Sequence, residues 1–121
     1  MKITPFGKEL RHIRIDRNET LRDMADRLAV SNSTLSGVEH GKFPPSDGLR
    51  ELIVEKYNLS TEAAQNLNRA YAETIDKVYF DLSDTPTEKR ELLLEVYDRL
   101  NALTTEEAAL IYSVLYRNDV R

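Results

Sequence analysis

The stretch from Glu19 to Gly41, ETLRDMADRLAVSNSTLSGVEHG, predicts two short helices separated by only three residues. Thr20 can cap the first helix, and Asp23 stands where a capping box needs a carboxylate. Apolar residues then recur at helical spacing, which gives this helix one buried face. Ser31 is a good N-cap for the second helix, and Gly41 is the residue type that commonly follows a helix end. This arrangement is typical of a helix-turn-helix and indicates DNA binding.

The second helix of the motif is poorly suited to a protein core. Only Leu35 and Val38 are available as apolar residues for its inward face. The outward face is expected to consist of small uncharged residues: Asn32, Ser33, Ser36 and Gly37. A helix of this kind suits the major groove of DNA, where polar side chains meet the base edges.

A joint pattern of apolar, capping and glycine positions extends over residues 4–60. It comprises Phe6–Arg11, Ile13, Arg14, Thr20, Leu21, Met24, Ala25, Leu28, Val30, Ser31, Ser33–Ser36, Glu39, Gly41, Lys42, Pro45, Ser46 and Leu49. With this pattern the chain resembles the lambda-repressor-like, or Xre, family of bacterial and phage regulators. The resemblance implies an all-α fold, with a four- to five-helix DNA-binding domain over residues 1–60. A helical extension over residues 61–121 would then serve dimerisation or partner binding.

The resemblance also implies roles for individual residues. Base edges would be read by Asn32, Ser33, Ser36 and Gly37, with Asn32 the best candidate because its amide can bond adenine N6 and N7 together. Gly37 has no side chain there, which suggests close backbone approach or reading of DNA shape. The DNA backbone would be held by Thr20, Leu21, Arg22, Thr34, His40 and Lys42. Arg14 and Glu39 would form a structural ion pair between the first and third helices.

Composition sets the outer limits of this interpretation. The chain has 121 residues and no cysteine, so disulfides and cysteine-based zinc sites are excluded. No apolar run approaches the length of a membrane span, and the N-terminus lacks the apolar segment of a signal peptide. We therefore expect a cytoplasmic protein that needs no metal or cofactor and does not enter the membrane.

The net charge of −4 first argues against a nucleic-acid partner. The charge is unevenly distributed, however. Residues 1–58 hold ten Lys and Arg against nine Asp and Glu, whereas residues 59–121 hold seven against twelve. The acidity therefore lies behind the motif, and a near-neutral domain can still bind DNA if its cations and helix N-termini face the phosphates.

The rest of the chain also predicts helices. One runs from Pro5 to about Arg17, and another follows the cap residue Ser46. A longer helix is expected from Ser60 to about Phe80. Two more are expected to begin at the capping signals of Thr85 and Thr104.

An enzyme is not expected from this sequence. His12 and His40 are 28 residues apart and form no metal-ligating spacing. Neither a glycine-rich phosphate loop nor a nucleophile elbow is present. Glu106 and Glu107 are neighbours and point to different helix faces, so they do not form a catalytic pair.

The sequence thus favours a homodimeric repressor that covers a promoter at an inverted-repeat operator in double-stranded DNA. The expected dimer interface lies on the apolar faces of the last two helices, at Leu93, Tyr97, Leu100, Ile111, Tyr112 and Leu115. The alternative is an antitoxin or adaptor whose C-terminal helices bind a partner protein, such as a toxin or an inactivating metallopeptidase. Symmetric burial of the tail in a homodimer would distinguish the repressor.

Overall fold

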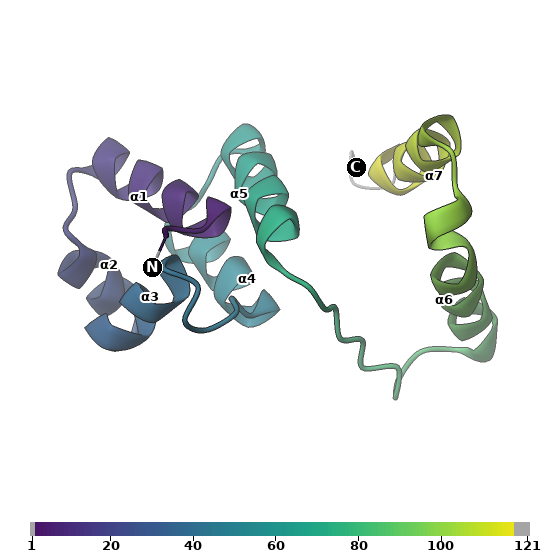
Figure 1. Ribbon diagram of the computed structural model, residues 1–121, viewed down its shortest axis with the longest axis horizontal. Coiled ribbons are helices and arrows are strands. Elements are labelled where there is room, and N and C mark those ends of the chain that lie inside the picture. Colours follow the sequence, from purple (N-terminus) through teal and green to yellow (C-terminus); the bar gives the residue numbers. More distant parts are fainter. Residues whose placement is uncertain (1, 118–121) are drawn as a thin grey trace. The chain divides into compact units, whose positions relative to one another are not determined.

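The computed structural model describes residues 2–117 and is helical, without strands, over that range. The predicted all-α fold class is confirmed. The chain divides into an N-terminal unit, residues 1–78, and a C-terminal unit, residues 79–121. Figure 1 labels their helices. The helices are α1 (Pro5–Arg17), α2 (Leu21–Leu28), α3 (Asn32–Glu39), α4 (Asp47–Lys56), α5 (Thr61–Thr74), α6 (Thr87–Arg99), the short 3₁₀ helix η1 (Leu100–Ala102) and α7 (Thr105–Arg117).

Polar side chains fix where the helices of the N-terminal unit begin. The Asp23 amide donates to the Thr20 hydroxyl at 3.1 Å, and the Thr20 amide donates to the Asp23 carboxylate at 2.9 Å, so the predicted capping box is present. Ser31 accepts from the amide of Thr34 at 3.0 Å and caps α3. The predicted caps Ser46 and Ser60 do the same for α4 and α5. These bonds satisfy amides that have no carbonyl partner within the helix.

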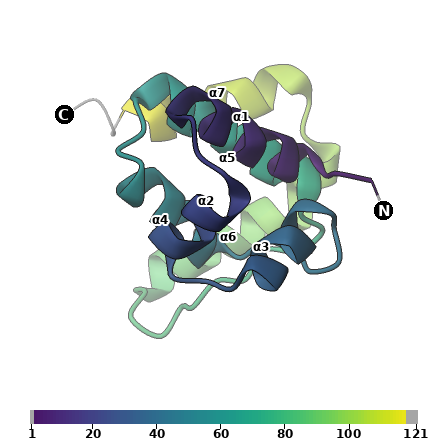
Figure 2. The ribbon, with the colours of Figure 1, turned by 90° about the vertical axis from the view of Figure 1, so that its left-hand side faces the viewer.

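One hydrophobic core holds the five helices of the N-terminal unit together. Its fully buried centre includes Phe6 and Leu10 from α1, Met24 from α2, Leu35 from α3 and Ile53 from α4. The other core members are Ile13, Ala25, Leu28, Val38, Tyr57 and Leu67. Figure 2 shows this unit facing the reader, with α1 alongside α5.

The N-terminal unit is larger than the predicted DNA-binding domain of residues 1–60. Helix α5 packs closely against α1, with Leu67 fully buried. The rings of Phe6 and Tyr71 meet edge to face, with their centroids 5.7 Å apart. The Phe6 amide donates to the Thr74 hydroxyl at 3.0 Å. The predicted boundary near residue 60 is therefore wrong, because α5 completes the core that α1 needs.

The helix predicted from Ser60 to about Phe80 is also shorter than expected. It ends at Thr74, and Ile75 is extended, with φ −81° and ψ 150°. Since α5 reaches the first turn of α1 at Thr74, a longer helix would have no further surface of α1 to pack against. The apolar spacing that continues through Val78 therefore does not mark a helix.

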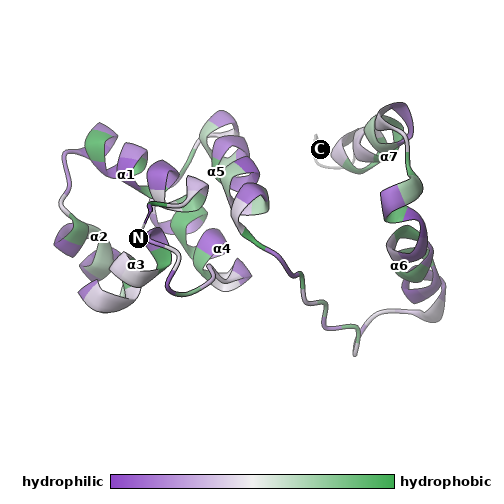
Figure 3. Ribbon diagram, viewed as in Figure 1, coloured by the Kyte–Doolittle hydropathy of each residue, from purple (hydrophilic) through white to green (hydrophobic). Residues whose placement is uncertain are grey.

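The C-terminal unit has no buried residue over residues 79–116. Figure 3 shows that α6 and α7 carry apolar residues. The exposed apolar set is Val78 of the linking stretch together with Tyr79, Phe80, Leu92, Leu94, Tyr97, Leu100, Leu110, Ile111, Tyr112, Val114 and Leu115. Burial of apolar surface is the main force that stabilises a folded domain. Residues 79–116 lack that contribution within their own unit.

The start of α6 differs from the prediction. Pro86, not Thr85, occupies the N-cap, and no side chain caps this helix. The carbonyl of Thr85 instead accepts from the Arg90 guanidinium at 2.7 Å, and Arg90 also reaches the carbonyl of Leu82. At α7 the prediction is confirmed, because Thr104 and Glu107 exchange both bonds of a capping box.

Candidate nucleic-acid interface

The turn between α2 and α3 is tight because Ala29 adopts a left-handed conformation, with φ 58° and ψ 40°. The amide of Val30 then donates to the carbonyl of Ala25 at 3.0 Å. Ser31 follows directly as the cap of α3. The two helices thus meet across three residues, as predicted from the spacing.

A buried ion pair fixes α3 against α1. Arg14 and Glu39 are 8% and 1% exposed. The Arg14 guanidinium donates to both carboxylate oxygens of Glu39, one of them at 3.1 Å. Arg11 adds a second, half-exposed cation, with Nε 3.7 Å from the same carboxylate. The ion pair implied by the resemblance is therefore present.

The backbones of α1 and α3 also approach each other closely. A Cβ atom on Gly7 would lie 2.3 Å from the carbonyl oxygen of Glu39, a distance that only glycine allows. The amide of Thr4 donates to the same oxygen at 2.9 Å. The C-terminal end of α3 is therefore held by α1, while its first turn faces outward.

The first turn of α3 displays three of the proposed contact residues. Asn32, Ser33 and Thr34 are all exposed. The Ser31 hydroxyl lies 2.8 Å from the Thr34 hydroxyl and 3.2 Å from that of Ser33, so these side chains form one small polar cluster. Ser36 is half-buried, and only part of it can reach a ligand.

Gly37 does not occupy the open reading position that the sequence suggested. It is buried, and a Cβ added to it would lie 2.6 Å from two ring atoms of Phe43. The amides of Lys42 and Phe43 both donate to the Gly37 carbonyl, at 2.8 and 3.3 Å. Gly37 is therefore not open to the surface as the sequence suggested, because the Phe43 ring covers it.

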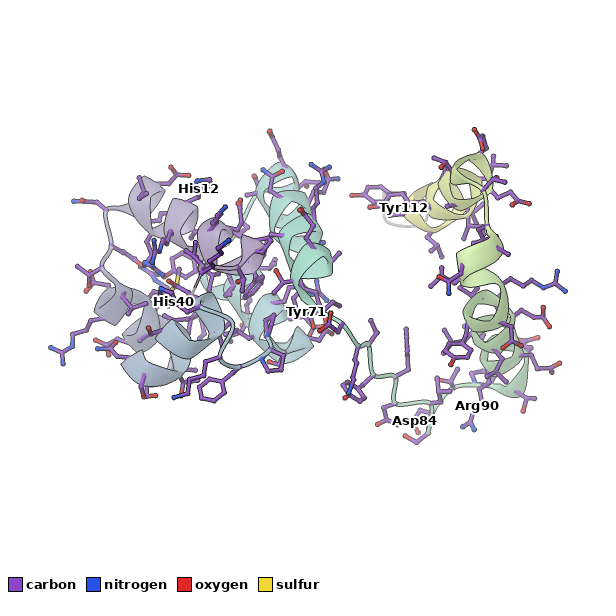
Figure 4. The ribbon with its side chains drawn as sticks, viewed as in Figure 1. His12, His40, Tyr71, Asp84, Arg90 and Tyr112 are labelled. Atoms are coloured by element: carbon purple, nitrogen blue, oxygen red, sulfur yellow. The ribbon has the colours of Figure 1, made fainter. Side chains whose placement is uncertain are left out.

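His40 also differs from an exposed phosphate contact. Its Nδ1 lies 2.9 Å from the Ser36 carbonyl and its Nε2 lies 3.4 Å from the Arg11 guanidinium. A proton on Nδ1 satisfies both contacts, since the carbonyl accepts and the guanidinium donates. His40, labelled in Figure 4, therefore links α3 to α1.

The N-terminus of α2 holds the other proposed backbone contacts. Thr20 and Arg22 are exposed, and Leu21 is half-buried. The Asp23 carboxylate bonds the Thr20 amide, and hydrogen bonds from the backbone and side chain of Thr20 lower the pKa of Asp23. A negative charge therefore already occupies part of this helix N-terminus.

Lys42 is exposed, and its ammonium group lies 5.5 Å from the centroid of the Phe43 ring. Because Lys42 forms no ion pair with an acidic residue of the described chain, it is better suited than the α2 N-terminus to contact a phosphate.

A second polar cluster was not predicted from the sequence. The Tyr57 hydroxyl donates to Glu19 at 2.6 Å, Arg27 donates to the other oxygen of Glu19, and the Arg27 guanidinium lies 4.7 Å from the Tyr57 ring centroid. The three residues come from the loop before α2, from α2 and from the end of α4. Only the folded chain brings them together, so neither spacing nor residue type signals the cluster.

The proposed dimer residues lie on α6, η1 and α7. Leu93 is half-buried, whereas Tyr97, Leu100, Ile111, Tyr112 and Leu115 are exposed. Tyr112, labelled in Figure 4, stacks at a tilt on Tyr116, with ring centroids 4.9 Å apart. Most of this set therefore lies on the surface of the C-terminal unit.

The described residues hold no group of three or more His, Asp or Glu placed to bind a metal ion. Within residues 2–117, no helix combines the length and apolarity needed to cross a bilayer.

No family model, curated protein or solved structure matches this chain. Membership of the Xre family therefore stays a prediction based on the residues themselves.

Proposed function

We propose that the protein is a sequence-specific DNA-binding regulator that acts in the cytoplasm as a homodimer and represses transcription by covering a promoter. The observation that carries this proposal is the fixed presentation of α3. Its C-terminal end is held by the Arg14–Glu39 pair and by close contact with Gly7, while Asn32, Ser33 and Thr34 are exposed on its first turn. A recognition helix presents residues in this way to the major groove.

Chemistry at the first turn supports base reading. The Asn32 amide can donate to adenine N7 and accept from adenine N6, and serine hydroxyls can bond either base edges or phosphates. Lys42 supplies a cation from the loop after α3. One N-terminal unit can make only a few base contacts and would bind with modest affinity. Two such units are therefore needed to recognise a DNA site specifically.

The exposed apolar residues of the C-terminal unit support the pairing of two chains. Apolar residues occur on all sides of α7 from Ala108 to Tyr116, with Ser113 the one polar residue of that run. A helix that is apolar all round is normally buried. A second copy of the chain would bury α7. The two N-terminal units of such a dimer would bind half-sites roughly 34 Å apart, or a multiple of that distance.

The direct test is selection of bound sequences from random double-stranded DNA, followed by gel shifts at increasing salt. We expect enrichment of an inverted repeat and salt-sensitive binding. Asn32→Ala should lower the preference for one adenine in each half-site by about tenfold, the lower part of the range for a bidentate contact. Asn66→Ala, an exposed asparagine of α5, is the matched control. Absence of any salt-sensitive preference for an inverted repeat would overturn the proposal.

A second candidate function rests on the same exposed apolar faces. An antitoxin or adaptor would use α6 and α7 to bind a different protein, such as a toxin or an inactivating metallopeptidase. Light scattering of the purified chain separates the two. A dimer that no longer exposes these residues supports the repressor, and a monomer at high concentration supports partner capture.

A further inference from the structure

Phe43 is the one aromatic residue exposed beside α3 among the described residues. Its side chain is 42% exposed, although its ring lies against the Cα of Gly37. A phenylalanine needed only for the core would be buried as Phe6 is, at 0% exposure. Phe43 therefore packs on Gly37 and still leaves part of its surface open to a ligand.

The structure holds this ring firmly over α3. Both Lys42 and Phe43 donate their amides to the Gly37 carbonyl, which closes the loop onto the last turn of the helix. The next two residues are prolines, which restrict the loop, and Pro45 is buried. Any side chain at position 37 would collide with the ring, so glycine and phenylalanine fit as a pair.

The ring is placed in line with the exposed first turn. Ser33 and Gly37 are four residues apart and therefore share one face of α3. By covering Gly37, Phe43 supplies a side chain at the one position of this face where α3 itself has none. This face of α3 therefore presents the Ser33 hydroxyl and, one turn further along, the apolar ring of Phe43.

We propose that Phe43 reads a thymine in the major groove through the C5-methyl group, in place of a side chain at position 37. The inference rests on the DNA-binding function proposed above. Thymine methyl is the apolar group that the major groove presents, and phenylalanine is a residue suited to contact it. Lys42, whose ammonium group lies 5.5 Å from the ring centroid, would supply a cation beside the same contact.

The test compares thymine with uracil, which differs only by lacking that methyl group. Each thymine of the selected operator is replaced in turn by uracil, and affinity is measured by fluorescence anisotropy. For the natural protein we expect one position per half-site at which uracil lowers affinity about fourfold, the contribution of one buried methyl group. Phe43→Ala should bind the thymine and uracil operators equally at that position.

Three controls make the comparison specific. Phe43→Leu keeps an apolar side chain and should retain part of the discrimination. Phe80→Ala removes an exposed phenylalanine of the C-terminal unit and should retain all of it. Gly37→Ala leaves Phe43 in the chain but displaces its ring. This variant should therefore lose the thymine-to-uracil discrimination, as Phe43→Ala does.

Each contrary outcome has a distinct meaning. Unchanged discrimination in Phe43→Ala, or equal weakening on all DNAs, would overturn the inference and leave the DNA-binding function in place. A natural protein that shows no thymine-to-uracil difference at any position would do the same. A natural protein that selects no DNA would instead overturn the proposed function first.

Discussion

At the scale of single residues, the buried carboxylate of Glu39 is the most sensitive point of the N-terminal unit. It bonds Arg14 and lies under the contact between α1 and α3. A buried ion pair adds little stability relative to an apolar pair, but removal of one partner leaves the other charge buried and unpaired. The pair therefore fixes geometry, and its loss is costly.

Glu39→Ala should accordingly lower the free energy of unfolding by about 3–5 kcal/mol. Urea denaturation followed by circular dichroism measures this difference. Glu55→Ala, which removes an exposed glutamate of α4, should change it by less than about 0.5 kcal/mol. An unchanged melting temperature in Glu39→Ala would count against the structural role of the pair.

Glu19 should make stability depend on pH in the acid range. Burial acts to raise its pKa, but hydrogen bonds from Tyr57 and Arg27 outweigh burial and lower the pKa below 4.5. The unfolded chain then binds the proton more readily, so the contribution of Glu19 is complete above about pH 4.5 and is lost as pH falls through the folded-state pKa. Thermal melts between about pH 7 and pH 3 should show Glu19→Gln losing less stability on acidification than the natural protein. Identical acid profiles would exclude this contribution.

Residue pairs were predictable from sequence to different degrees. The Arg14–Glu39 pair followed from a resemblance, because both residues belong to the motif pattern. The Phe43–Gly37 contact did not, because it depends on how the loop after α3 folds back and donates two amides to the Gly37 carbonyl. Side-chain identity alone gives no such information.

At the scale of elements, the turn between α2 and α3 carries a conformational cost. Ala29 is exposed and left-handed, a region that residues with a Cβ atom adopt at a cost of about 1–2 kcal/mol. Ala29→Gly should therefore stabilise the protein by about 0.5–1 kcal/mol, after the greater entropy of glycine in the unfolded chain is subtracted. Ala72→Gly, at an exposed site within α5, should destabilise it by about 1 kcal/mol. Equal effects of the two substitutions in urea melts would contradict the assigned turn geometry.

Helix α5 should decide whether the N-terminal unit folds alone. A fragment of residues 1–78 contains the whole core and should unfold cooperatively in urea. A fragment of residues 1–60 lacks Leu67 and Tyr71 and should show no cooperative unfolding. Leu67→Ala within residues 1–78 should cost about 2–5 kcal/mol. A cooperative transition for residues 1–60 of the same midpoint would show that α5 is dispensable.

Helix starts were easier to predict than helix ends. The serine and threonine caps act locally, so those of α2, α3, α4, α5 and α7 can be found in the sequence, whereas Thr85 does not cap α6. The end of α5 depends instead on where α1 begins, which is a tertiary relation. For the same reason, the apolar residues at 75 and 78 gave a false continuation of the helix.

At the scale of the whole molecule, the chain combines a unit with a core and a unit whose described residues, 79–116, are not buried. The exposed apolar residues of α6 and α7 predict association between copies of the chain. Leu115→Glu, at a position 62% exposed, should convert a dimer into a monomer in light scattering and leave the melting of the N-terminal unit unchanged. Ile15→Glu, at a position 73% exposed on α1, is the matched control and should remain dimeric. Dimers of unchanged affinity in Leu115→Glu would place the interface elsewhere.

The lack of buried residues over positions 79–116 also has a consequence for how operator binding would respond to the amount of protein. If that unit becomes ordered only when two chains meet, pairing and ordering are one event, and the dimer population at low concentration rises with the square of the amount of protein. Occupancy of an operator by the dimer would then rise more steeply with synthesis than occupancy by a monomer. Dilution during cell growth would likewise release the operator abruptly, without any need for an inducing ligand.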